Sequence, residues 1–237
     1  KMKADFVATG HYVRIMERKT DKEKQKYGLF EAKDKNKDQS YFLYRLKQHQ
    51  LAKLIFPLGK YKKTEVRRMA KKFNLPAFDK AESQNICFIK DDDTQRFLKR
   101  YLRMMKKGEI IDQNGKIIGE HQGLPLYTLG QRRGINIGGS GPYYVVSKDS
   151  KKNILLVTND PKELNLYSTG MKVGDISWTA GSAKPPIEVM VKTRYRQQVS
   201  RGIIKRKKSG IMEVQFSKPE RAVTPGQSAV FYDKNGE

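Results

Sequence analysis

The sequence predicts an α/β segment followed by an all-β segment, on three observations. Up to about residue 104, apolar residues recur mostly at helical spacing around a short apolar run at 54–59. Beyond Gly108 the spacing changes to strict alternation. The strands expected there are regularly spaced, with Gly, Pro and Asn but no helix between them, which is typical of a small β-barrel.

The elements of the α/β segment follow in order. Two strands are expected at 5–15 and 27–32 around a charged hairpin tip at 20–26, then a helix over 39–54 and a buried strand at 54–59. Thr64 caps a second helix, with an inner face formed by Val66, Met69, Ala70 and Phe73. A third helix is expected over about 94–104, with Phe97, Leu98 and Tyr101 inside. This succession predicts a layered α/β unit of which the chain holds the later half.

The β segment opens with a predicted hairpin. Asn114-Gly115 between two short apolar runs indicates a type I′ turn. Further strands are expected at 153–159, 171–178, 187–195, 200–207, 210–216 and 228–233. The expected domains are residues 1–93, a mixed central module at 94–168 and a C-terminal β-barrel at 169–237.

The net charge of the chain limits the classes of function that the sequence suits. The 237 residues include 49 Lys and Arg against 25 Asp and Glu, a net charge of +24. Such an excess attracts polyanions, either nucleic acid or anionic lipid. No apolar run approaches the ~20 residues that span a bilayer and no signal peptide is visible, so we expect a soluble, cytoplasmic protein without a membrane partner. One cysteine and three histidines show no metal-ligand spacing, so no metal site is expected.

Two segments of the α/β part have candidate binding residues. Gly10 and His11 follow a buried strand, whose carboxyl end faces the ligand crevice in an open α/β sheet. The alternative is an ordinary turn with a hydrogen-bonded His. Residues 37–40 (KDQS) open a helix, where backbone donors and Lys37 suit an anion or RNA. A plain capped helix start explains them equally well.

The cysteine lies in SQNICFI at 83–89. Strand alternation places Cys87 on the face opposite Ile86 and Phe88. If those two side chains fill the core, the thiol of Cys87 lies on the other face of the strand, away from the core. Neighbouring cations such as Lys80 and Lys90 would favour the thiolate that sulfur chemistry requires. An inert buried cysteine is the alternative.

Two basic segments of the β part suit RNA. Arg132 and Arg133 lie in a glycine-rich loop, where their guanidinium groups suit bidentate contacts to phosphate. The alternative is a solvated basic loop that binds nothing. Arg194, Tyr195 and Arg196 alternate on a predicted barrel strand, where Tyr can stack a base and Arg can hold phosphate. An ordinary exposed strand would also be charged.

The order of these motifs resembles the tRNA-specific 2-thiouridylase (MnmA/TrmU) family of bacteria and mitochondria. The resemblance covers the whole chain and rests on the segments ATGHY, KDQSYFL, LIFPLG, TEVRRMA, SQNICFI, YTLGQRRGINIGG, RYRQ and PGQSAVFYD. It implies that residues 1–93 are the C-terminal part of a Rossmann-like PP-loop ATP-pyrophosphatase domain.

The resemblance also implies a chemistry and a set of residues. ATP, with Mg²⁺, adenylates the wobble uracil at its position-2 oxygen, and sulfur from a cysteine persulfide displaces AMP. The sulfur comes from a donor protein, a cysteine desulfurase or a sulfur-relay carrier. Carried over by position, Cys87 is the persulfide cysteine and Gly10 an ATP contact. The implied tRNA contacts are His11, Lys37, Asp38, Gln39, Arg194, Tyr195 and Gln227.

The family's phosphate loop and its first catalytic cysteine are not found in this sequence, so we expect the chain alone to be inactive. The disulfide bond that the resemblance implies needs a cysteine besides Cys87, the only one here. A non-catalytic basic RNA-binding protein is the alternative function. A DNA-binding protein is a third, supported by charge but by no recognisable groove-reading helix.

Overall fold

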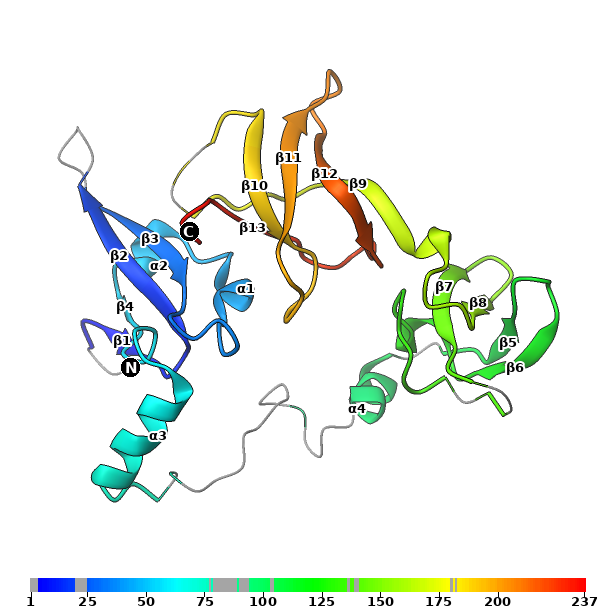
Figure 1. The fold of residues 1–237 in the computed structure, drawn as a ribbon, viewed down its shortest axis with the longest axis horizontal. Coiled ribbons are helices and arrows are strands. Elements are labelled where there is room, and N and C mark those ends of the chain that lie inside the picture. Colours follow the sequence, from blue (N-terminus) through cyan, green and yellow to red (C-terminus); the bar gives the residue numbers. More distant parts are fainter. Residues whose placement is uncertain are drawn as a thin grey trace. The chain divides into compact units, whose positions relative to one another are not determined.

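The computed structural model describes residues 4–19, 25–76, 78, 89, 94–102, 105–135, 137–138, 141–179, 181 and 183–237 (Figure 1). The chain forms two compact units. Unit 1 comprises Lys1–Lys80, Thr169–Lys218 and Gln227–Glu237, and unit 2 comprises Ala81–Ser168 and Pro219–Gly226. Cys87 and the hairpin tip at 20–24 lie outside the described residues.

The first part of unit 1 is a small α/β assembly. Strand β1 (Val7–Ala8) pairs in parallel with β4 (Leu54–Ile55), and β2 (Val13–Lys19) pairs with β3 (Gln25–Glu31) as an antiparallel hairpin. Val13, Leu29 and Leu51 are buried at the centre of this part. The α/β character predicted for this segment is confirmed.

The single helix predicted over 39–54 is instead two short helices, α1 (Ser40–Leu43) and α2 (Gln48–Leu51). The chain leaves the helical conformation at Lys47, whose backbone is extended. The Gln50 side chain accepts a hydrogen bond from the Lys47 amide, and Gln48 bonds both backbone groups of Tyr27 on β3. A local cap and a tertiary contact thus override the helical pattern.

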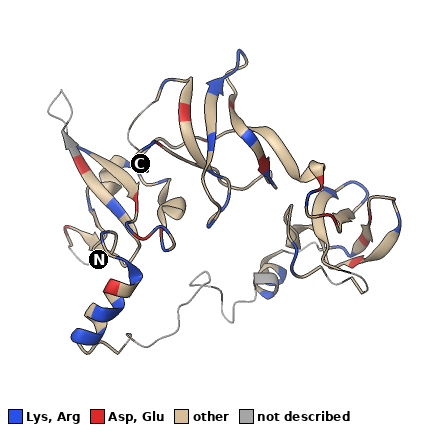
Figure 2. Ribbon diagram, viewed as in Figure 1, with Lys and Arg blue, Asp and Glu red and all other residues tan. Residues whose placement is uncertain are grey.

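Helix α3 (Lys63–Lys72) is strongly basic, and Figure 2 shows blue Lys and Arg segments along its ribbon with one acidic segment, Glu65, in the first turn. The inner face predicted for it is wrong, since none of its residues is buried and Phe73 is 66% exposed. Helix α4 (Thr94–Tyr101) is confirmed, although Tyr101 is exposed rather than inside.

The C-terminal strands of the chain form one antiparallel sheet. They are β9 (Tyr167–Val173), β10 (Ile187–Lys192), β11 (Ser200–Arg206), β12 (Met212–Arg221) and β13 (Val230–Tyr232), in the order β13-β10-β11-β12-β9. Among the described residues no pairing joins the two edge strands, so the sheet is open, whereas a closed barrel was predicted. A three-residue β13 offers few backbone groups to a second partner.

Unit 2 contains a four-stranded sheet in the order β6-β5-β8-β7. Its strands are β5 (Gly108–Ile111), β6 (Ile117–His121), β7 (Tyr144–Asp149) and β8 (Ile154–Thr158). Two 3₁₀ turns accompany it: η2 (Leu124–Leu126) lies between β6 and β7 in sequence, and η3 (Leu164–Leu166) follows β8. The core consists of Ile110, Leu124, Leu126, Tyr127, Val145, Leu155 and Val157.

The hairpin at Asn114-Gly115 forms between β5 and β6, but not with the predicted type I′ turn. That turn needs positive φ at both residues, and only Gly115 has it, at 79°. The Asp112 carboxylate accepts hydrogen bonds from the amides of Asn114 and Lys116, both at 2.9 Å. This local side-chain acceptor stabilises a wider turn instead.

None of the described helices combines the length and the apolar character that a bilayer span requires.

Candidate functional site

Three segments that are remote in sequence meet within unit 1. The Tyr41 hydroxyl donates to the Ser228 carbonyl at 2.8 Å, and the Tyr44 and Ser228 hydroxyls lie 2.8 Å apart. The ring of Phe42 lies 4.4 Å, centroid to centroid, from that of Tyr195. We call residues 37–44, 192–197 and 227–228 the α1 surface. It brings together most of the residues predicted to contact tRNA.

A buried charge network underlies the α1 surface. Asp38 is 4% exposed and accepts hydrogen bonds from the Ala32 amide at 2.8 Å and the Ser40 hydroxyl at 2.7 Å. The Lys192 ammonium lies 2.8 Å from Glu31 and 3.5 Å from Asp38. Because the Ser40 proton is donated to Asp38, the Tyr232 hydroxyl 3.0 Å away must donate to Ser40.

The network keeps its groups in one protonation state. Burial raises the pKa of Glu31, but hydrogen bonds from Lys192 and Lys35 outweigh it, so the pKa lies below its ordinary value of 4.5. Burial also raises the pKa of Tyr232 above its ordinary value of 10.0, against a hydrogen bond with Ser40 that lowers it. Tyr232 therefore stays a donor and Glu31 an anion at neutral pH.

Several predicted tRNA contacts serve the fold as well. Gln39 accepts a hydrogen bond from the Tyr12 amide at 3.0 Å through its side chain, and its own amide donates to the Tyr12 carbonyl at 2.8 Å. Asp38 is enclosed in the charge network. Lys37 is partly exposed and Gln227 is exposed.

Arg194 and Tyr195 do not lie on a strand as predicted. Strand β10 ends at Lys192, and the two residues form a turn that Arg196 completes with a φ of 67°. The Thr193 hydroxyl donates to the Gln197 side chain at 2.7 Å across this turn. A turn displays its side chains in several directions rather than on two alternating faces.

Aromatic side chains lie next to the arginines of this turn. Phe42 is 52% exposed, and the Arg196 guanidinium lies 5.6 Å from the centroid of Tyr195. Burial raises the pKa of Tyr41, as does neighbouring Tyr44, and the charge of Arg194 opposes them. Sequence reasoning missed Phe42 because an apolar ring at helical spacing fits the inner face of the single helix predicted over 39–54.

Gly10 and His11 follow β1 on the side where it and the parallel strand β4 both end, as predicted. The strand itself is exposed rather than buried, since Val7 is 55% exposed. His11 Nδ1 is 2.9 Å from the Thr9 hydroxyl, and its ring meets Phe56 edge-on at 6.2 Å. A Cβ added to Gly10 would touch only Leu58, at an ordinary 3.7 Å. The fold itself therefore does not require glycine at position 10.

Arg132 and Arg133 lie in unit 2, and both are exposed. The loop beneath them is fixed by Gln131, whose side chain accepts from the Thr128 amide and donates to the Arg133 carbonyl, both at 2.9 Å. The Gln131 carbonyl also accepts from the Val145 amide at 3.0 Å. The backbone is held while the two guanidinium groups face solvent.

A metal centre is not formed by the described residues, where no group of three or more His, Cys, Asp or Glu side chains could hold an ion.

Three family models match the chain in succession. The tRNA methyl transferase HUP domain matches residues 1–91, the tRNA methyl transferase PRC-barrel domain matches 95–159, and the Aminomethyltransferase beta-barrel domain matches 168–237. Together they define a three-part protein of a tRNA-modifying class.

Curated relatives narrow this class. The chain is 46% identical over 232 residues to the tRNA-specific 2-thiouridylase MnmA of Listeria monocytogenes serotype 4a, covering 97% of this chain and 61% of the relative. It is 45% identical over 235 residues to that of Idiomarina loihiensis, covering 97% and 62%. The MnmA of Alkaliphilus oremlandii is 41% identical over 237 residues, covering 98% and 64%. The chain belongs to the MnmA/TrmU family, and it spans about three fifths of the length of these relatives.

Proposed function

We propose that this chain is part of a cytoplasmic tRNA-uridine 2-sulfurtransferase, and that the described residues supply much of its tRNA-binding surface. The observation that carries the proposal is the 41–46% identity, over nearly the whole chain, to proteins named tRNA-specific 2-thiouridylase. The net charge of +24 is consistent with a polyanionic substrate.

The α1 surface is the proposed contact for tRNA within unit 1. Arg194 and Lys37 provide cations for phosphate, and Tyr195 with the exposed Phe42 provides rings for stacking. Asp38 and Gln39 act mainly by holding this surface, since their side chains bond Ala32, Ser40, Lys192 and Tyr12. His11 and Gln227 are further tRNA contacts in this proposal, and Arg132 and Arg133 are phosphate contacts from unit 2.

The proposed chemistry places ATP, with Mg²⁺, at the carboxyl ends of β1 and β4. A Cβ at Gly10 would contact only the Leu58 side chain, which supports close approach of a nucleotide to the backbone there. ATP transfers AMP to the position-2 oxygen of the wobble uracil and releases pyrophosphate. The terminal sulfur of a persulfide on Cys87 then bonds to the carbon, and AMP leaves with the oxygen. A second cysteine thiol, which the complete protein must supply because Cys87 is the only cysteine of this sequence, attacks Cys87 Sγ. The S–S bond to the uridine sulfur then breaks, which releases 2-thiouridine and leaves a disulfide that a reductant must reopen. A donor protein, a cysteine desulfurase or a sulfur-relay carrier, restores the persulfide.

Binding is tested with the 237-residue chain, unmodified tRNA and duplex DNA of similar length. We expect preference for tRNA, with an affinity that falls steeply as salt rises. Tyr195→Ala should weaken tRNA binding by about 1–3 kcal/mol through loss of stacking. Tyr167→Ala is the matched control, because Tyr167 is 38% exposed on β9 and outside the α1 surface. Equal loss in both variants, or equal affinity for the DNA, would count against the proposal.

The chemical step is tested with the complete gene product. Cys87→Ser replaces the sulfur with oxygen at nearly constant volume, so it should abolish formation of 2-thiouridine while tRNA affinity is retained. Mass spectrometry of nucleosides from the reacted tRNA measures the product. Thiolation at an appreciable rate by this variant would assign Cys87 a structural role and leave the non-catalytic RNA-binding alternative open for this part of the protein.

A further inference from the structure

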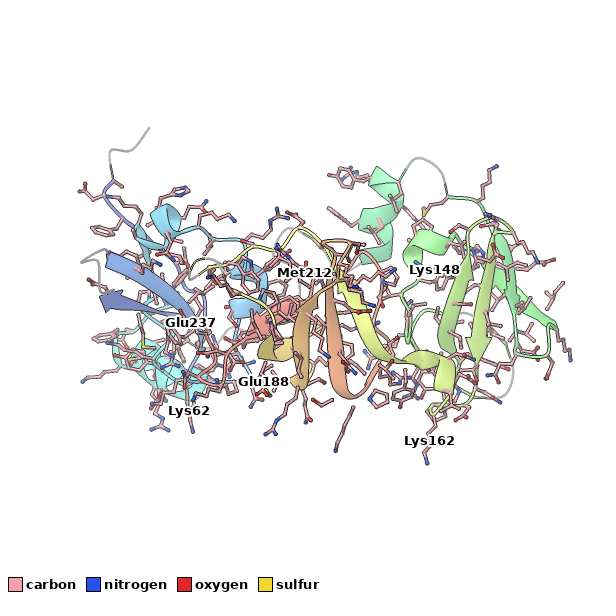
Figure 3. The ribbon with its side chains drawn as sticks, turned by 90° about the horizontal axis from the view of Figure 1, so that it is seen from above. Lys62, Lys148, Lys162, Glu188, Met212 and Glu237 are labelled. Atoms are coloured by element: carbon pink, nitrogen blue, oxygen red, sulfur yellow. The ribbon has the colours of Figure 1, made fainter. Side chains whose placement is uncertain are left out.

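A cavity of about 750 Å³ lies in unit 1 beside the C-terminal sheet. Its walls come from the end of β9 and the residues after it (172–178), from Ala183 and Pro185, and from the β11–β12 hairpin (206 and 209–212). Figure 3 labels Met212, the first residue of β12 and part of this lining. Cavities of roughly 300–1,000 Å³ are the usual size for small-ligand sites.

We propose that this cavity binds one unstacked nucleotide of an RNA, with the base against Trp178 and the phosphate between Lys172 and Arg206. The proposal rests on the proposed function in that tRNA supplies the nucleotide. It adds a site separate from the α1 surface, since the two share no residue.

The lining combines apolar surface with positive charge. Val173, Ile176 and Trp178 form apolar wall, and Ile211 adds an apolar rim that is 46% exposed. Aromatic rings bind bases of any sequence because every base has a π-face. An apolar wall alone would suit many ligands, so the charged side chains of the lining decide the chemical class of the ligand.

The charged groups of the lining are two cations and one acid. The acid, Asp175, is paired with Arg45 at 2.9 Å, so its charge is compensated from outside the cavity. Lys172 and Arg206 are both exposed. A cavity with a ring, apolar walls and uncompensated cations matches a base joined to a phosphate.

The wall that carries Trp178 is held on both sides. Lys47 donates to the Ser177 hydroxyl at 3.0 Å, and Gln48 donates to the Thr179 carbonyl at 2.5 Å. Both donors come from the start of α2, and Gln48 is itself anchored to Tyr27. The ring is therefore placed before a ligand arrives, which lowers the entropy lost on binding.

Gly174 is part of the cavity lining and has room for a side chain. A Cβ at Gly174 would meet no atom within 4 Å, and its backbone does not have the positive φ that demands glycine. A larger side chain there is thus compatible with the fold and would occupy space that a ligand needs. Gly174→Val is accordingly a variant that blocks the cavity without removing any contact.

Trp178 is the only tryptophan of the chain, so intrinsic fluorescence reports on this cavity directly. The 237-residue chain is titrated with a single-stranded oligouridine pentamer and with blunt duplex RNA. We expect saturable quenching by the single strand and little by the duplex, whose bases remain stacked. Arg206→Gln should weaken the single-strand affinity by about tenfold, and Gly174→Val should abolish the quenching.

Lys208→Gln is the matched control, because it removes one charge from the same hairpin but Lys208 is not part of the lining. Its quenching curve should coincide with that of the unsubstituted chain. Equal effects of Arg206→Gln and Lys208→Gln would overturn the proposal, as would quenching by polyglutamate or by duplex RNA at the same concentration.

A separate tRNA titration by anisotropy distinguishes the two proposals. Tight tRNA binding without any change in Trp178 fluorescence overturns the cavity site and leaves the proposed function intact. Saturable quenching by the pentamer in a chain that does not prefer tRNA to DNA supports the cavity and counts against the proposed function.

Discussion

The α1 surface and the Arg132-Arg133 loop both looked like basic anion sites in the sequence, yet they are built in opposite ways. In the α1 surface the polar side chains are bound to one another, with Asp38 4% exposed and Lys192 between two carboxylates. In the loop one side chain, Gln131, holds the backbone, and both arginines are exposed. A charged motif thus serves the fold where partners surround it, and its charges stay available to a ligand where they do not.

This comparison predicts different consequences for stability and for binding. Substitutions in the buried charge network of the α1 surface should change the free energy of unfolding, and those in the loop should change RNA affinity alone. Three substitutions test the difference, from the largest expected effect to the smallest.

Asp38→Ala should have the largest effect. It leaves Lys192 with Glu31 alone and removes the acceptor of the Ala32 amide and the Ser40 hydroxyl. Breaking a buried ion pair from one side typically costs about 3–5 kcal/mol of unfolding free energy. Urea denaturation of the 237-residue chain measures it. Asp175→Ala breaks the exposed pair with Arg45, where the acid is 77% exposed, and should cost no more than about 1 kcal/mol. Similar costs in the two variants would refute the distinction.

Lys192→Met should change how stability depends on pH. The folded pKa of Glu31 is below 4.5, so its contribution is present above that pH and is lost as pH falls through the lowered value. Without Lys192, burial of Glu31 is less opposed and its pKa rises. The variant should therefore be less stable at neutral pH, and its stability should fall less as pH drops through the acid range than that of the unsubstituted chain.

Thermal unfolding between about pH 3 and pH 7 measures both changes. Lys35→Met is the control, because Lys35 is 61% exposed and also bonds Glu31. It should change both in the same direction but by less, since solvent screens an exposed pair. A larger change for Lys35→Met would show that burial of the partner does not decide the effect.

The double change Arg132→Ala with Arg133→Ala should have the smallest effect on the fold, within about 0.5 kcal/mol of unfolding free energy. The double variant should bind tRNA more weakly. The slope of log affinity against log salt concentration should also decrease by about one for each arginine removed, since each holds about one phosphate. Filter binding over a salt series gives both values. Lys151→Ala with Lys152→Ala removes the same charge from an exposed turn of unit 2 and should leave the salt slope unchanged.

The alternation of apolar and polar residues, together with turn residues, predicted the strands better than the helical spacing of apolar residues predicted the helices. Strands at 154–158, 187–192 and 200–206 fall where the alternating pattern placed them. The helix over 39–54 failed because Gln50 caps Lys47 and Gln48 bonds Tyr27, contacts that apolar spacing does not contain. The exposure of Phe42 follows from the same break.

The sequence by itself determined the family, the α/β-then-β order of elements and the excess of positive charge. These depend on residue identity and on periodicity along the chain, which are local properties. The tertiary structure decided which charges are used internally, that Arg194 and Tyr195 lie on a turn, and that a cavity forms around Trp178. Each of these depends on residues far apart in sequence, such as Asp38 with Lys192 and Lys172 with Arg206, and no local pattern encodes that proximity.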